Sequence, residues 1–147
     1  MNLPSIVIGA FIILEFSNVI ALYFKPEFKF ANGIGTFTAW EKSKKDPEIH
    51  NFAKYMVNWV AGTKLIFLLL LVVILFTADQ TTIDLTLFAL FLSTLTFFWR
   101  LFPLFRKMDQ ESQINPKNYS TYLFLMILLI VIFFLISFYI SSSFLEL

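Results

Sequence analysis

Four long runs of apolar residues dominate the sequence, and they restrict it to very few folds. A membrane-spanning α-helix needs about 20 mostly apolar residues, and the runs meet or approach that length. They predict helices over about residues 3–24, 47–76, 81–105 and 119–140. Backbone groups in hydrocarbon must be satisfied within the helix, and the alternating pattern of a β-barrel is missing. The expected fold class is therefore all-α: a polytopic membrane protein whose single domain is a bundle of four transmembrane helices.

Prolines and polar residues mark where these helices begin and end. Pro4 lies in the first turn of the first helix, where its missing N–H costs little. That helix ends at Lys25, because the residue before a proline is pushed out of the α region. Asp46–Pro47–Glu48 has the order of a helix start: a cap, a first-turn proline and an acidic residue. The two long connections left by these signals are residues 25–46 and 106–118.

The first connection contains a candidate helix of its own, from Thr36 to Lys45. Phe37 and Trp40 share one side of it, and Glu41 and three lysines surround the other. This pattern is typical of a short helix that lies in the membrane interface.

The cations are distributed on one side of the predicted bundle. Of the eleven lysines and arginines, all except Lys64 lie in or beside the first and third connections. The second connection has no cation, and its charged residues are Asp79 and Asp84. Because cytoplasmic loops are enriched in Lys and Arg, both termini are expected to be extracytoplasmic, with the plasma (inner) membrane as the location. The expected contacts with anionic lipid headgroups at the cytoplasmic face are Lys42, Lys44, Lys45, Arg100, Arg106 and Lys107.

Two ionisable side chains fall inside predicted spans, and such residues are costly enough to be functional candidates. Glu15 lies near the middle of the first span, with Asn18 on the same face at the i+3 spacing. Its carboxyl either binds a proton or cation, or holds helices together as a neutral or paired group. Lys64 lies at a comparable depth in the second span. It either pairs with Glu15 or extends its long stem toward the interface.

Uncharged polar residues form two further stripes. Asn58 shares a face with Asn51, Tyr55 and Gly62, whereas Thr86 and Ser93 belong to a stripe that ends at Arg100. Each stripe is either a helix-packing seam or part of a hydrated lining. The candidate residues for an intramembrane polar or ion-binding site are Glu15, Asn18, Asn58, Lys64, Thr86 and Ser93.

Several function classes are disfavoured by what the chain lacks. It has no cysteine and one histidine, His50, so neither a metal site nor a cofactor is expected. A net charge of +1 argues against nucleic acid as a partner. No hydrolase, zinc-protease or calcium-loop motif is present, and an enzyme is not the favoured interpretation.

The segment Ala10-Phe-Ile-Ile-Leu-Glu15-Phe-Ser-Asn18-Val-Ile-Ala-Leu-Tyr-Phe-Lys25 resembles the first helix of small multidrug-resistance exporters. That family also consists of short four-helix proteins with a membrane-embedded glutamate in helix one. The resemblance ends there, because the long basic connection and the glycine-poor third helix do not fit. Membrane-bound glutathione-type enzymes are similar in size and helix count, but Lys54, Asn58 and Lys64 do not match their second helix. Both are analogies of fold.

These observations favour a small multi-pass protein that passes or binds a small solute, proton or cation at a polar site around Glu15. The alternative is a non-catalytic accessory or scaffold subunit whose polar seams only dock helices. A third interpretation is an enzyme that acts on lipid and holds a headgroup phosphate at the basic connection. Four short helices enclose little space, so a homo-oligomer or a partner membrane subunit is expected.

Overall fold

The computed structural model describes residues 2–29 and 34–141, and it confirms the all-α bundle of four spans. Three spans are single helices: α1 (Leu3–Phe24), α3 (Pro47–Thr77) and α6 (Tyr119–Ile140). The remaining span is continuous through α4 (Gln80–Thr96), the π-helical turn η2 (Phe97–Leu101) and α5 (Phe102–Gln110). Between α1 and α3 lie the 3₁₀ turn η1 (Ile34–Thr36) and the short helix α2 (Thr38–Ser43).

Short polar side chains cap the helices at the expected positions. Asn2 accepts a hydrogen bond from the Ser5 N–H at the start of α1. Asp46 accepts from two backbone N–H groups in the first turn of α3, and Asp79 accepts from one in α4. Each cap satisfies backbone donors that the first helical turn leaves without partners.

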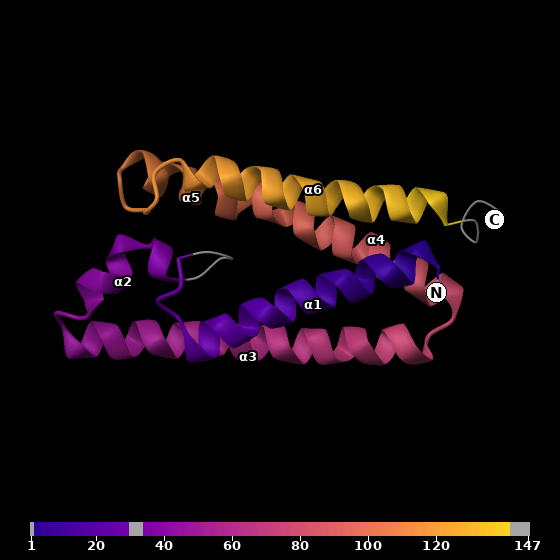
Figure 1. The fold of residues 1–147 in the computed structure, drawn as a ribbon, viewed down its shortest axis with the longest axis horizontal. Coiled ribbons are helices and arrows are strands. Elements are labelled where there is room, and N and C mark those ends of the chain that lie inside the picture. The colour runs from indigo at the N-terminus through magenta and orange to yellow at the C-terminus, as the bar shows by residue number, and fades with distance from the viewer. Residues whose placement is uncertain (1, 30–33, 142–147) are drawn as a thin grey trace.

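The four spans run antiparallel along the long axis of the molecule (Figure 1). α1 packs mainly on α3 and α6, and α4 packs mainly on α6. α2 and the α5–α6 connection lie at one end, which we call the basic end. The start of α1 and the end of α6 lie at the other end (Figure 1).

The surface of the bundle is suited to lipid. Within the most apolar window of each span, between 11% and 22% of the residues are buried inside the protein. Most apolar side chains therefore point outward, where hydrocarbon and not water must cover them. The protein is accordingly a small integral membrane protein.

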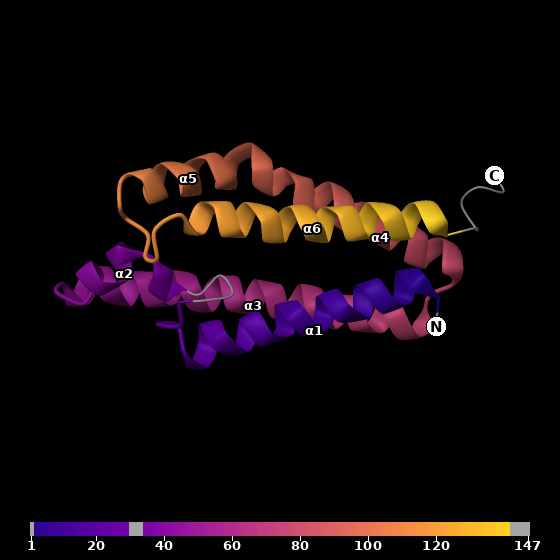
Figure 2. The ribbon, with the colours of Figure 1, turned by 45° about the horizontal axis from the view of Figure 1, so that its top comes forward.

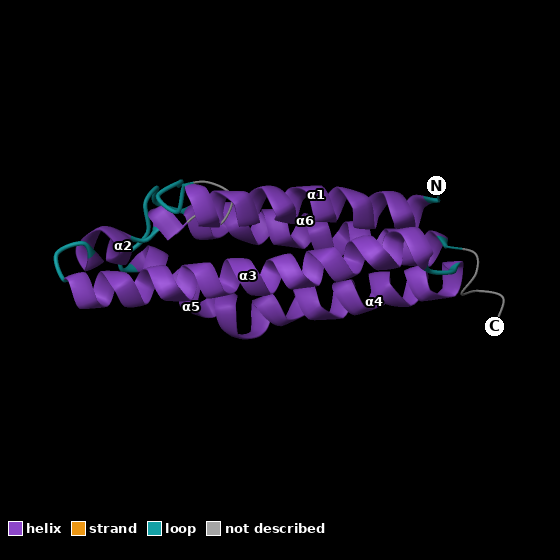
Figure 3. Ribbon diagram, turned by 90° about the horizontal axis from the view of Figure 1, so that it is seen from below, coloured by secondary structure: helices purple, strands orange, loops and turns teal. Residues whose placement is uncertain are grey.

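The third span is longer than the sequence indicated, because it ends at Gln110 and not near Phe105. Its middle contains the π-helical turn, visible as a widened loop in Figure 3 and a bend in Figure 2. The Phe102 N–H bonds the carbonyl of Phe97, five residues back. Pro103 explains the change, since it cannot donate an N–H and its ring clashes with the carbonyl four residues before it.

The two connections at the basic end are joined. The Thr38 N–H donates to the Gln113 carbonyl, and the Asn115 N–H donates to the Thr36 carbonyl, each at 2.9 Å. Phe37 packs edge-on against Phe105 with ring centroids 5.6 Å apart. Trp40, on the apolar side of α2 that was expected in the membrane interface, is buried, so this side packs on the protein.

Candidate functional site

The two ionisable groups predicted inside the membrane form an ion pair. Lys64 of α3 donates to Glu15 Oε2 of α1 at 2.6 Å and to Asn18 Oδ1 at 2.8 Å. Glu15 and Asn18 are three residues apart on α1, so one helix face presents both oxygens. Of the two interpretations of Lys64, the structure shows pairing and not extension toward the interface.

This ion pair is partly buried and partly accessible. The side chain of Lys64 is 31% exposed and that of Glu15 is 17% exposed, while Asn18 is buried. A pair enclosed on every side would have lost most of its hydration, which makes burial costly. Here part of each charged group still faces open space beside the helices.

That space consists of two cavities that meet at Lys64. The larger cavity, of about 360 Å³, extends from Asn18 and Lys64 to Thr36 and Phe37 at the basic end. The smaller cavity, of about 240 Å³, is lined by Glu15 and Lys64. Lys64 and Ile127 line both cavities, so they lie at the boundary. The remaining walls are mostly aliphatic and aromatic.

The sequence missed one polar residue at this site. Thr94 of α4 lines the smaller cavity together with Glu15 and Lys64. Its Oγ1 donates to the Leu90 carbonyl of its own helix at 2.7 Å. Thr94 stands next to the predicted Ser93, and no local signal separates the two, because only the rotation of α4 decides which of them faces inward.

Three predicted site residues lie away from the ion pair. Asn58 is exposed on the outside of α3. The Thr86 hydroxyl donates to the Thr82 carbonyl, and the Ser93 hydroxyl donates to the Leu90 carbonyl. Neither hydroxyl bridges to another helix within the described residues, so the structure does not bring these three side chains to Glu15.

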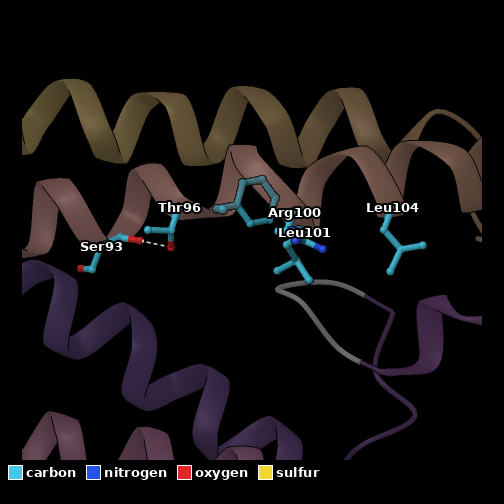
Figure 4. Close-up of a pocket in the computed structure, with 6 residues that line it drawn as sticks. Ser93, Thr96, Arg100, Leu101 and Leu104 are labelled. Carbon is cyan, nitrogen blue, oxygen red and sulfur yellow. Dashed lines mark hydrogen bonds between the residues drawn. The ribbon is translucent and has the colours of Figure 1, made fainter.

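Ser93 instead borders an open hollow of about 570 Å³ beside the π-helical turn, which shares Phe97 and Leu101 with the larger cavity. The side chains that line this hollow project from one side of the third span, as Figure 4 shows for Ser93, Thr96, Arg100, Leu101 and Leu104. Arg100 contributes the charge, and its guanidinium lies 5.5 Å from the ring centroid of Trp99.

The predicted headgroup-binding cations are exposed, but two of them already have acidic partners. Lys44 lies 2.6 Å from Glu27 and 3.0 Å from Glu41, and Lys107 lies 3.8 Å from Glu111. The hydrogen bond with Glu27, followed by that with Glu41, raises the pKa of Lys44. The same hydrogen bond, together with the Lys44 charge, lowers the pKa of Glu27.

The other four predicted headgroup contacts form no ion pair within the described part of the chain; they are Lys42, Lys45, Arg100 and Arg106. Arg106 borders a polar cavity of about 350 Å³ where α6 begins. There Asp109 accepts from the Ser120 N–H at 2.9 Å and from the Ser120 hydroxyl at 2.6 Å. Asp109 thus caps α6 from a distant position in the sequence.

A buried acidic group lies at the opposite end of the bundle. The predicted third span, residues 81–105, includes Asp84 near its start, and this residue lies within α4 and is completely buried. Its Oδ1 accepts from the Gln80 side chain at 2.9 Å and from the Ser141 hydroxyl at 2.7 Å. The Asn2 side chain donates to Gln80, so this cluster links α1, α4 and α6.

No group of three or more His, Cys, Asp or Glu residues positioned to hold a metal ion occurs among residues 2–29 and 34–141. No protein-family model, curated protein or solved structure shows a significant match to the chain.

Proposed function

We propose that this protein binds, and in an assembly passes, a small solute or proton at the polar site formed by Glu15, Lys64 and Asn18. The observation that carries the proposal is the position of Lys64, which lines both cavities. A charged group reachable from two sides can exchange its partner for a ligand. A charged group in a dry seam cannot.

The arrangement argues against a purely structural role for the pair. A strut between helices is best made by groups whose hydrogen bonds are all used within the protein. Lys64 has three N–H donors, of which Glu15 and Asn18 accept two. The Oε1 atom of Glu15 has no donor among the described residues, and its side chain lines the smaller cavity.

The accessory-subunit alternative keeps one observation in its favour. Asn58 is a polar side chain on the outer surface of α3, which also exposes large apolar residues such as Trp59 and Ile66. An outward amide is suited to a hydrogen bond with another membrane helix, from a second copy or a different subunit.

We further propose that the basic end faces the cytoplasm and contacts anionic lipid. Lys42, Lys45 and Arg106 support this because they are exposed and have no acidic partner within the described residues. Each cation near an anionic surface contributes about 1 kcal/mol to association. Lys44 and Lys107, which have acidic partners, are expected to contribute less.

Water access to the cavities tests the main proposal. The chain has no cysteine, so a single-cysteine variant reports one position. Ile127 of α6 lines both cavities, whereas Leu129 of the same helix is 55% exposed on the outer surface. In liposomes, Ile127→Cys should react with a membrane-impermeant thiosulfonate, because a reactive thiolate forms only where water reaches it.

Leu129→Cys is the matched control, since it lies at similar depth in the same helix and faces hydrocarbon. It should remain unmodified under the same conditions. A second cavity position, Leu123→Cys, guards against a local effect of one substitution. If Ile127→Cys and Leu123→Cys are both as inert as Leu129→Cys, the seam is dry and the scaffold interpretation replaces the proposed site.

A further inference from the structure

The two sides of Lys64 differ in the chemistry that they offer a ligand. Lys64 and Asn18 are the polar groups at the inner end of the larger cavity, Thr36 and Tyr119 line it elsewhere, and Glu15 lines only the smaller cavity. The third N–H of Lys64 has no acceptor among the described residues. The larger cavity therefore presents a cationic hydrogen-bond donor at its inner end.

Apart from Thr36 and Tyr119, the rest of the larger cavity is apolar. Leu22, Met56, Phe97, Phe105 and Leu123 contribute to its walls. Its volume of about 360 Å³ is at the lower end of the range of about 300–1,000 Å³ that is usual for ligand sites. Such a cavity fits a small molecule with an apolar body and one anionic or acceptor group.

We infer that the larger cavity binds a small amphipathic monocarboxylate, whose carboxylate pairs with Lys64, and that Glu15 takes up one proton when this ligand binds. The inference rests on the proposed site and adds its ligand class and its coupling. Before binding, the site holds the Glu15 carboxylate and the Lys64 ammonium. After binding, it holds the Glu15 carboxylic acid and the Lys64 ammonium paired with the ligand. One O–H bond forms on Glu15, and the net charge of the site is zero in both states.

Electroneutrality is the physical reason for the coupling. An anion added to the intact ion pair would leave one uncompensated negative charge, and a proton on Glu15 alone would leave an uncompensated Lys64. Either charge is costly at this depth in a membrane. Each event therefore lowers the cost of the other, and the coupling is reciprocal.

The surroundings of Glu15 contain no competing charge within the described residues. Lys64 of α3 is the charged group that faces it, α4 contributes Thr94, and α6 contributes Ile127 and Ile130. The Thr94 hydroxyl is bonded to its own helix. Protonation of Glu15 therefore acts on Lys64 directly.

An anionic ligand also agrees with the charges at the basic end, toward which the larger cavity extends. Lys42, Lys45 and Arg106 are exposed there and attract anions while they repel cations. A ligand ammonium would also have to displace Lys64 from Glu15, although Lys64 is covalently tethered next to that carboxylate.

The test compares three probes of equal chain length: octanoate, octylammonium and the neutral methyl octanoate. Each is titrated into the full-length protein in phosphatidylcholine nanodiscs, with empty nanodiscs subtracted. We expect saturable binding of octanoate alone. Its affinity should fall about tenfold for each unit of rise in pH wherever the unliganded site holds the Glu15 carboxylate, as uptake of one proton requires. Calorimetry in two buffers with different ionisation enthalpies counts that proton directly.

Two variants assign the roles. Glu15→Gln carries a neutral side chain in place of the protonated acid, so it should bind octanoate with an affinity independent of pH. Adding Lys64→Met to Glu15→Gln removes the ammonium without leaving a lone carboxylate, and octanoate binding should be lost. Lys54→Met removes an exposed lysine from the same helix and should bind octanoate as the wild type does.

Binding of octanoate without proton uptake, or preference for octylammonium or the ester, would overturn the inference and leave the proposed site standing. Octanoate binding by Glu15→Gln that depends on pH would also overturn it. If no probe binds, the inference fails, and the reactivity of Ile127→Cys then decides whether the proposed site fails with it.

Discussion

The hydroxyl of Ser141 donates to the Asp84 carboxylate at 2.7 Å and joins the end of α6 to the first turns of α4. Asp84 is completely buried, and Gln80 of its own helix donates to the same oxygen. A buried carboxylate is tolerated only when such donors compensate it. This cluster therefore fixes α6 beside α4 at the end opposite the cation-rich loops.

Removal of the Ser141 hydroxyl should loosen that end of the bundle. Ser141→Ala deletes a hydrogen bond to a buried acidic group, so we expect the free energy of unfolding to fall by about 1.5–3 kcal/mol. Ser93→Ala is the control, because its hydroxyl bonds only its own helix and the side chain is exposed. Denaturant unfolding in micelles, followed by circular dichroism, compares them. Equal effects of the two substitutions would show that the Asp84 bond does not stabilise the fold.

The Glu15–Lys64 pair should behave as a coupled unit in unfolding. Lys64→Met leaves the Glu15 carboxylate without its cation, and we expect a loss of about 1–3 kcal/mol. This is less than the about 3–5 kcal/mol for fully buried pairs, because Lys64 is 31% exposed. The double variant with Glu15→Gln should recover part of the loss. Strictly additive effects in the same unfolding measurement would show that the two groups are not coupled.

Both termini are predicted to be extracytoplasmic, because all the cations except Lys64 lie at or near the basic end. A reporter enzyme that is active only outside the cytoplasm should be active when fused after Leu147. The same reporter inserted between Lys42 and Lys45 should be silent. The reverse pattern of activity would invert the proposed orientation.

Acid should weaken the attachment of α2 through the Glu27–Lys44 pair. Lys44 lowers the pKa of Glu27 from its ordinary value of 4.5, so the stabilising contribution is complete above that value and is lost as the pH falls through the lowered one. The fluorescence of Trp40, measured with Trp59 and Trp99 replaced by Phe, follows this change. Glu27→Gln should remove the acid transition, and an unchanged transition in that variant would assign it to another group.

At alkaline pH the Glu27–Lys44 pair is expected to lose its stabilising contribution as the pH rises, the opposite direction to the acid transition. The hydrogen bond with Glu27 raises the pKa of Lys44 above its ordinary value of 10.5. Its contribution is therefore complete below 10.5 and is lost only as the pH rises through the raised value. Between the two limits the contribution of the Glu27–Lys44 pair should not change with pH. Because the His50 ring lies 4.9 Å from that of Trp40, this contribution is read as the difference in Trp40 fluorescence between the wild type and Glu27→Gln.

Much of the fold could be predicted from the sequence because it depends on local signals. The apolar runs set the number of spans, and Asn2, Asp46 and Asp79 cap helices where short polar side chains were available. The end of the third helix was predicted too early, because Arg106 and Lys107 mark where the apolar run ends. A helix can nevertheless continue into water beyond the membrane. The π-helical turn before Pro103 has the same local cause as any proline distortion, although the sequence does not distinguish a kink from a widened turn.

By itself the sequence determined that this chain spans the membrane four times, that its cations gather at one end, and that Glu15 and Lys64 lie at comparable depths. Only the tertiary structure decided that these two side chains meet, that Thr94 and not Ser93 faces them, and that Asp84 is buried. The physical reason is rotation. Hydrophobicity fixes how deep a residue lies, but successive residues on a helix point about 100° apart. Which of them faces a cavity is therefore set by how the four helices turn and pack against one another.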